Sequence, residues 1–422
     1  MNTASLRDMI AATRLTRAGR LTEATAFLQR LLHGEAASRD AHPPVGAGGP
    51  IIDLVAETIE MADADPSPRT EPAYRVDAGR GRFGDADGAV RPPMPAALRS
   101  FLERDGFKPP LGGLASPSPP EAPAVVPDGA QFLTATFSNQ VGSRPYKLYV
   151  PSGYHGQGVP LIVMLHGCTQ SPDDFAAGTR MNVAAEEHTC LVVYPGQTTA
   201  ANMSKCWNWF SAGDQQRDRG EPSLIAGITR EVMRQYAIDP RRVYVAGLSA
   251  GAAAAAIMGA AYPDLYAAIG VHSGLACGAA SDLPSAFAAM RQGNRESACR
   301  LGTPPEGGAR QIVPAIVFHG DQDTTVHPRN GDDVIAQSAP ATLLETRVEA
   351  GSVPGGHTYS RTLHADTNGE TVLEQWVIHG AGHAWAGGSL AGSYTDPHGP
   401  NATREMLRFF LEHPRRANPQ RV

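Results

Sequence analysis

The 422-residue sequence has no apolar run that approaches the roughly 18 residues a membrane span requires. It has no Lys or Arg run long enough for a nucleic-acid footprint, and its net charge is -6. We therefore expect no transmembrane segment and no nucleic-acid partner. Residues 1–33 also lack the apolar core and small-residue cleavage site of a secretory signal, which leaves the location open between the cytoplasm and export by another route.

Metal and nucleotide motifs are missing as well. No H-E-x-x-H or paired C-x-x-C occurs, and no G-x-G-x-x-G follows a predicted strand. The glycine-rich segment 353–361 contains no phosphate-loop lysine and is predicted to be a surface loop, with His364 and Asp366 facing solvent. We therefore expect neither a metal nor an organic cofactor.

The N-terminal third differs in composition from the rest of the chain. Over residues 1–33, apolar residues recur at helical spacing with one interruption, which predicts an amphipathic helical hairpin. A single tetratricopeptide-like helix is the weaker interpretation, because no second copy follows. Arg14, Arg17 and Arg20 lie beside apolar positions, so this hairpin is a candidate for docking to a granule, a membrane surface or a protein partner. Residues 34–127 are rich in Ala, Gly, Pro, Asp and Arg and are expected to form a flexible linker.

Residues 128–415 alternate strand-like and helical stretches, the pattern of a mostly parallel, doubly wound α/β sheet. Two opening antiparallel strands precede solid apolar runs, which suit strands covered on both faces. The expected strands are 132–137, 144–150, 160–167, 190–196, 241–249, 266–274, 313–323 and 372–383. The expected helices are 173–188, 223–236, 250–262 and 402–413.

The segment 241–262 carries the most informative motif. A strand runs into Gly247-Leu248-Ser249-Ala250-Gly251 and then directly into an Ala-rich helix. This G-x-S-x-G pattern needs small residues two positions either side of the serine, because the strand-to-helix turn is sharp and strained. The turn presents the hydroxyl above the sheet, at the positive end of the helix dipole. Ser249 is therefore the candidate nucleophile, and a glycine-rich turn with an ordinary serine is the alternative.

An acid and a histidine follow in the order that an α/β-hydrolase arrangement requires. Asp323 and His383 each come just after a strand, at the edge where ligands gather in open α/β sheets. Asp323 is preferred over Asp321 because it fits the H-G-x-x-D-x-x-V pattern, and Asp321 would then brace the loop. His379 is the rival base. Ser249 needs a base to take its proton, and that base needs a carboxylate to fix its tautomer.

Two backbone N–H groups are predicted to stabilise an oxyanion. One belongs to Ala250, directly after the serine, and the other to Cys168, in the loop that follows the first apolar strand. An apolar substrate subsite is expected from the few aromatic residues nearby: Trp207, Trp209 and Trp385. The spacing of Trp207 and Trp209 also fits one ring in the core and one at the rim.

All five cysteines lie in the predicted catalytic domain, and spacing alone does not fix their connectivity. We expect Cys168–Cys206 and Cys277–Cys299 disulfides, because each would tie a loop near the site. Cys190 lies inside an apolar strand and is expected to be free. Five reduced thiols in a cytosolic enzyme is the alternative.

Several segments together resemble the poly(3-hydroxybutyrate) depolymerase family of esterases, which is related to feruloyl and acetylxylan esterases. They are LHGCTQSPDDFAAGTRMNVAAEEHTCLVVYPGQ, CWNWF, GLSAGAAAAA, FHGDQDTTVHPRNG and HGAGHAWAGG. The resemblance covers about residues 131–414 and implies an α/β-hydrolase fold. It places Ser249, Asp323 and His383 on the family's triad and Cys168 on its oxyanion position.

The resemblance implies hydrolysis of a small-molecule or polymeric carboxylic ester through an acyl-serine. Feruloyl or acetylxylan esterase activity with the same triad is the alternative. A granule- or membrane-associated binding protein with secondary esterase activity is the alternative from another class. Many family members are secreted, and no separate polymer-binding module is visible after Pro414, so efficient attack on crystalline polyester is not expected.

Overall fold

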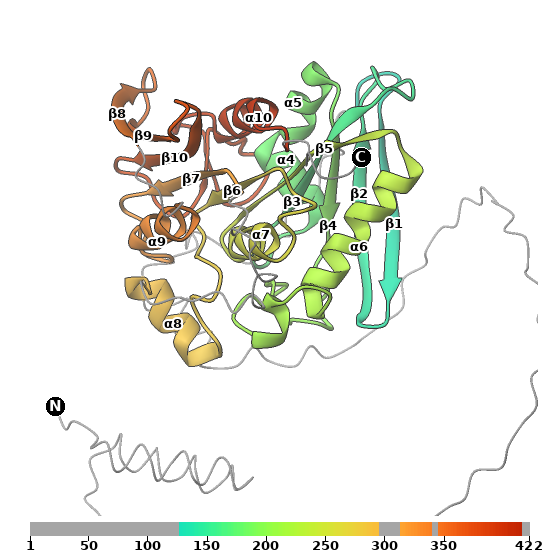
Figure 1. The fold of residues 1–422 in the computed structure, drawn as a ribbon, viewed down its shortest axis with the longest axis horizontal. Helices are drawn as coiled ribbons and strands as arrows, with labels where there is room; N and C mark the ends of the chain where they lie inside the picture. The colour runs from blue at the N-terminus through green and yellow to red at the C-terminus, as the bar shows by residue number, and fades with distance from the viewer. Residues whose placement is uncertain (1–125, 295–312, 340–344, 416–422) are drawn as a thin grey trace, which may run out of the picture. The chain divides into compact units, whose positions relative to one another are not determined.

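The computed structural model describes residues 126–294, 313–339 and 345–415 (Figure 1). The predicted N-terminal hairpin, nearly all of the predicted linker, and Cys299 lie outside these residues. Within the described residues, no helix is long and apolar enough to cross a membrane.

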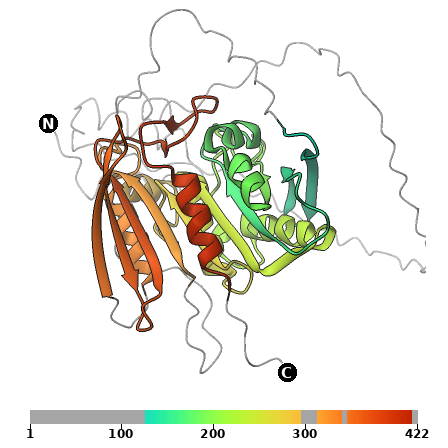
Figure 2. The same cartoon turned by 90° about the horizontal axis from the view of Figure 1, so that it is seen from above.

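A ten-stranded sheet forms the centre, in the order β1-β2-β4-β3-β5-β6-β7-β10-β9-β8. Its strands are β1 (Gln131–Asn139), β2 (Gly142–Val150), β3 (Val159–Leu165), β4 (Leu191–Pro195), β5 (Ile238–Leu248), β6 (Ala268–His272), β7 (Ala315–Gly320), β8 (Glu345–Ser352), β9 (Thr358–Ala365) and β10 (Thr371–Ile378). The pairs from β4 through β10 in this order are parallel, and β1, β2, β8 and β9 are antiparallel additions at the two ends. Figure 2 shows these additions at opposite ends of the sheet.

Helices cover both faces, as the solid apolar strands predict. They are α4 (Pro172–Thr179), α5 (Met181–His188), α6 (Gly220–Gln235), α7 (Ala250–Ala261), α8 (Leu283–Gln292), α9 (Arg329–Ser338) and α10 (Ala402–Glu412), with a 3-10 turn η1 (Ala212–Gln215). One core layer joins the sheet to α6, α7 and α9, and the other joins it to α4, α5 and α10 (Figure 1). This order, with antiparallel β2 beside a parallel sheet wound on both faces, is the α/β-hydrolase fold and confirms the predicted fold class.

Some local predictions are wrong. The single helix expected over 173–188 is two helices, because Arg180 adopts a left-handed conformation (φ 56°) between them. The loop expected over 353–361 is a hairpin turn that runs into β9. His364 and Asp366 are half-buried rather than solvent-facing, and Nδ1 of His364 lies 3.2 Å from the Thr346 hydroxyl.

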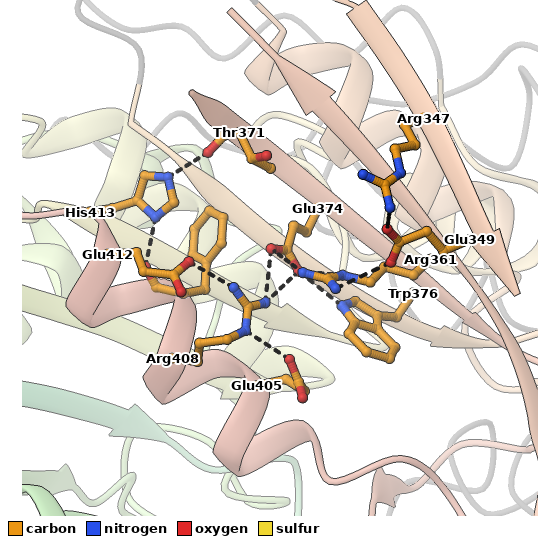
Figure 3. Close-up of polar contacts among 11 residues, drawn as sticks. Arg347, Glu349, Arg361, Thr371, Glu374, Trp376, Glu405, Arg408, Glu412 and His413 are labelled. Atoms are coloured by element: carbon orange, nitrogen blue, oxygen red, sulfur yellow. Dashed lines mark hydrogen bonds and ion pairs between the residues drawn. The ribbon is translucent and has the colours of Figure 1, made fainter. Parts of the chain in front are cut away.

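A buried carboxylate fastens α10 to the sheet (Figure 3). Glu374 of β10 is 1% exposed and accepts hydrogen bonds from Arg361 of β9 at 2.9 Å and from Arg408 of α10 at 2.8 Å. Arg408 also pairs with Glu405 and Glu412 on its own helix. The cluster holds together β9, β10 and α10, and β10 leads directly into the segment that carries His383.

Candidate active site

Ser249 occupies a strained turn between β5 and α7. Its backbone has φ 57° and ψ -120°, a region that side-chain-bearing residues rarely adopt. Glycine is required at both flanking positions, because neighbouring backbone atoms lie too close to leave room for a Cβ. A Cβ on Gly247 would collide with the backbone of Gly251, and a Cβ on Gly251 would collide with the Leu165 carbonyl of β3. The G-x-S-x-G sequence therefore folds here because only glycine fits at these two positions.

The carboxylate of Asp323 is buried, and His383 is its partner. His383 donates from Nδ1 to Oδ2 of Asp323 over 2.7 Å. The other oxygen, Oδ1, accepts the N–H groups of Thr325 and Val326 at 2.9 and 2.8 Å. Burial raises the pKa of Asp323, but hydrogen bonds from His319 and His383 outweigh burial and hold that pKa well below its ordinary value. The carboxylate therefore stays charged beside the imidazole.

A buried histidine, His272, bonds to both the nucleophile turn and the His383 segment. Its carbonyl accepts the Ser249 N–H at 2.9 Å, and its ring Nε2 accepts the Ala386 N–H at 3.0 Å. Burial lowers the pKa of His272 to about 3, so the ring is neutral. Because Nε2 is an acceptor, the proton is on Nδ1, which lies 3.2 Å from the Ser273 hydroxyl. The described hydrogen bonds do not include one between Ser249 and His383, and such bonds commonly tighten only when substrate is bound.

The loop after β3 lies against the serine. A Cβ on Gly167 would lie 3.6 Å from the Ser249 Cβ. The Gly167 N–H is already used, since it donates to Oε1 of Gln170 at 2.9 Å. Within the described residues, by contrast, the N–H groups of Cys168 and Ala250 have no described acceptor. These two donors are the pair that the sequence predicts for the oxyanion.

Covalent and polar contacts hold this loop from behind. The expected Cys168–Cys206 disulfide is present and joins it to the segment after β4. The ring of His166 accepts the Gln197 N–H at 3.0 Å, and burial lowers the pKa of His166 to about 4, so this acceptor stays neutral. The buried Glu221 of α6 in turn bonds to the Gln197 side chain.

The other cysteines have distinct environments. Cys277 is disulfide-bonded, while the partner we expect for it, Cys299, lies outside the described residues. Cys190 is free and buried, and burial raises the pKa of its thiol to about 12. Cys190 is therefore an unreactive packing residue.

The three tryptophans expected to form a substrate subsite are buried. Trp207 is 0% exposed and donates its indole N–H to the His166 carbonyl. Trp385 is 1% exposed, stacks on His272 and donates to Thr403. Neither ring offers a face to a ligand, so the structure does not support the predicted contact for these two. Trp209 is also in the core and is 6% exposed.

The rival acid and base pair with each other instead. His379 donates to Asp321 at 3.0 Å, and its second ring nitrogen contacts Ser360. In the described part of the chain, no cluster of three His, Cys, Asp or Glu side chains is arranged to hold a metal.

Sequence reasoning missed the residues that support the site. His272 bonds to Ala386, Gln170 bonds to Gly167, and Gln197 bonds to His166. None of these roles was predicted from the sequence. A polar residue inside an otherwise apolar strand, as His272 is in β6, is the signal that marks such a position.

The strand order, the strained serine turn and the buried Asp–His pair together define an enzyme of the α/β-hydrolase class. Residues 144–351 match the family described as Esterase PHB depolymerase. The match identifies residues 144–351 as a domain of that family.

Curated relatives carry related names. The chain is 32% identical over 253 residues to poly(3-hydroxyalkanoate) depolymerase C of Paucimonas lemoignei, covering 59% of this chain and 60% of that protein. It is 30% identical over 241 residues to a poly(3-hydroxybutyrate) depolymerase of Ralstonia pickettii, covering 54% of this chain and 48% of that protein. It is 28% identical over 298 residues to feruloyl esterase B of Neurospora crassa, covering 66% and 91%. The chain thus spans about half to three fifths of the length of the two depolymerases.

Proposed function

We propose that this protein is a serine carboxylic-ester hydrolase of the polyester depolymerase type. The observation that carries the proposal is the buried Asp323–His383 hydrogen bond, 2.7 Å long, beside a serine held in a strained strand-to-helix turn. A buried, charged carboxylate fixes the imidazole tautomer with its proton on Nδ1, which leaves Nε2 free to accept a proton. Within the described residues, Nε2 of His383 has no described partner.

The reaction proceeds through an acyl-serine. Oγ of Ser249 attacks the ester carbonyl carbon as its proton passes to Nε2 of His383. The N–H groups of Cys168 and Ala250 receive the negative oxygen of the tetrahedral intermediate. Collapse breaks the bond to the alcohol oxygen, which takes the proton from His383. Water then attacks the acyl-serine by the same steps, and the acid and Ser249 are released.

Hydrolysis of p-nitrophenyl butyrate by the wild type and by Ser249→Ala, both purified without reductant, tests the proposal. We expect kcat to fall by about 10⁴-fold or more in the variant. Activity within about tenfold of the wild type would mean that another residue is the nucleophile.

The substrate is a second question for the same site. The depolymerase relatives favour short polyesters of 3-hydroxy acids. The feruloyl esterase match, which spans 91% of that relative, favours an ester of ferulic acid as the second candidate. Product profiles on poly(3-hydroxybutyrate) oligomers and on methyl ferulate separate the two. Cleavage of nitrophenyl esters alone would leave a general esterase.

A further inference from the structure

Three side chains that the proposed triad does not use form a second Ser–His–Asp series. His379, just after β10, donates from Nδ1 to Oδ2 of Asp321 over 3.0 Å. Its Nε2 lies 2.9 Å from the hydroxyl of Ser360 on β9. Oδ1 of Asp321 accepts the Gly380 N–H at 2.7 Å. The residue types and the order of the hydrogen bonds are those of a serine hydrolase triad.

The serine of this series is poorly placed for catalysis. Ser360 pairs with Ala350 of β8 on one side and with Val377 of β10 on the other. N–H groups inside antiparallel ladders are used for strand pairing and do not converge on an oxyanion. Ser249, by contrast, directly precedes helix α7, and the N–H of Ala250 at the start of that helix has no described acceptor. The second series is therefore better suited to holding structure than to attacking a substrate.

The series lies where two segments meet. The Asp321 N–H donates to the Ile378 carbonyl at 3.0 Å, and the Gln322 N–H donates to the Ala381 carbonyl at 3.0 Å. A Cβ on Gly320 would collide with the same Ala381 carbonyl, so the two backbones are in direct contact. One segment follows β7 and the other follows β10.

These two segments carry the proposed acid and base. Asp323 is the second residue after Asp321, and His383 is the third after Gly380. Asp321 bonds to Gly380 at one end, and Asp323 bonds to His383 at the other. The two short stretches of backbone and the hydrogen bonds that join them at each end form a closed ring. This ring limits how far the carboxylate of Asp323 and the imidazole of His383 can move apart.

The pair is too exposed to be a major source of stability. The side chains of His379 and Asp321 are 41% and 33% exposed. Exposed ion pairs contribute at most about 1 kcal/mol to the free energy of unfolding. Burial raises the pKa of Asp321, but hydrogen bonds from Gly380 and His379 outweigh burial and lower that pKa, so Asp321 remains an acceptor. Loss of the pair should leave the protein folded.

We propose that Asp321 and His379 are positioning residues that hold the Asp323 segment against the His383 segment. Because this role rests on the triad proposed above, it has consequences for kcat rather than for substrate binding. Ser360 orients the outer nitrogen of His379 and takes no part in acyl transfer.

Asp321→Ala and His379→Ala test the role, with kcat and KM for p-nitrophenyl butyrate and urea unfolding measured for each. We expect kcat to fall about 10- to 100-fold, as misplacement of reacting groups by about 1 Å does, while KM stays within about twofold. His379→Asn should recover most of the activity, because its amide can donate to Asp321 from near the Nδ1 position. Thr324→Ala, at an exposed position of the same segment, is the matched control and should be as active as the wild type.

Several outcomes would overturn the positioning role: unchanged kcat in Asp321→Ala, an equal loss in Thr324→Ala, or a loss of kcat explained by a lowered unfolding midpoint. Labelling of Ser360 by a fluorophosphonate in Ser249→Ala would also overturn it, since Ser360 would then be a nucleophile. An active Ser249→Ala refutes the proposed function itself. An inactive Ser249→Ala together with a fully active Asp321→Ala refutes only the positioning role.

Discussion

His383 donates a 2.7 Å hydrogen bond to Asp323, a carboxylate that is 4% exposed and also accepts two backbone N–H groups. Asp323→Asn keeps an oxygen for the backbone donors but offers an N–H₂ group to the imidazole. The wrong tautomer of His383 is then favoured, and we expect kcat to fall by about 10⁴-fold with KM little changed. Steady-state kinetics on a nitrophenyl ester measure this. A loss below about tenfold would show that Asp323 does not orient the base.

The Cys168–Cys206 disulfide closes a 38-residue separation next to a proposed oxyanion donor. The double variant Cys168→Ala/Cys206→Ala should lose about 4 kcal/mol of unfolding free energy through the freed chain. We also expect kcat to fall by up to about 100-fold under conditions where the variant is folded, because the Cys168 N–H is less well held. Cys190→Ala, which removes the free thiol, is the control. Equal kcat in the double variant and this control would show that the disulfide does not contribute to catalysis.

Two buried neutral histidines make stability depend on pH. Burial lowers the pKa of His272 to about 3 and of His166 to about 4, from 6.5. Below 6.5 the unfolded chain binds protons that the folded protein does not, so stability falls as pH decreases towards 4 and is unaffected by these groups above 6.5. Each histidine contributes about 1.4 kcal/mol per pH unit. Urea unfolding at about pH 7 and about pH 5 measures the slope.

His272→Asn should reduce that slope whatever its cost at neutral pH. A wild-type unfolding free energy that is the same at both pH values would contradict the neutral, buried state of these rings.

The cluster in Figure 3 contributes to stability through its buried member. Glu374→Gln removes the buried charge to which both Arg361 and Arg408 bond. We expect a loss of about 3 kcal/mol, near the lower end for a broken buried pair, because both arginines keep more exposed carboxylate partners on Glu349, Glu405 and Glu412. Glu412→Gln removes an exposed partner of Arg408 and should cost less than about 1 kcal/mol. Similar unfolding midpoints for the two variants would refute this difference.

Much of the fold follows from local sequence. Solid apolar runs predict the parallel strands because those strands are covered on both faces. The serine turn is predicted because only glycine fits sterically on either side of it. β8 and β9 were missed because their residues are polar or only half-buried, so neither an apolar run nor a clean alternation marks them.

The supporting contacts of the site could not be predicted in the same way. The His272 ring bonds to Ala386, which is 114 residues away in sequence, and the Gln170 side chain bonds to the Ser393 carbonyl, which is 223 residues away. Such bonds depend on how the strands are ordered, which no local pattern specifies. The predicted substrate contacts of Trp207 and Trp385 failed for the same reason. An aromatic residue near a catalytic motif suggests a ligand contact, and only the packing around it shows that it is buried.

The strained backbone of Ser249 lowers the stability of the fold, while its hydroxyl serves the proposed reaction. A conformation of this kind costs about 1–3 kcal/mol, and glycine would adopt it with less strain. Selection for stability alone would therefore favour Ser249→Gly, and we expect that variant to unfold at a higher urea concentration than the wild type. The proposed role of Ser249 as nucleophile accounts for a serine at this position, and it holds the chain below the stability that its own fold could reach.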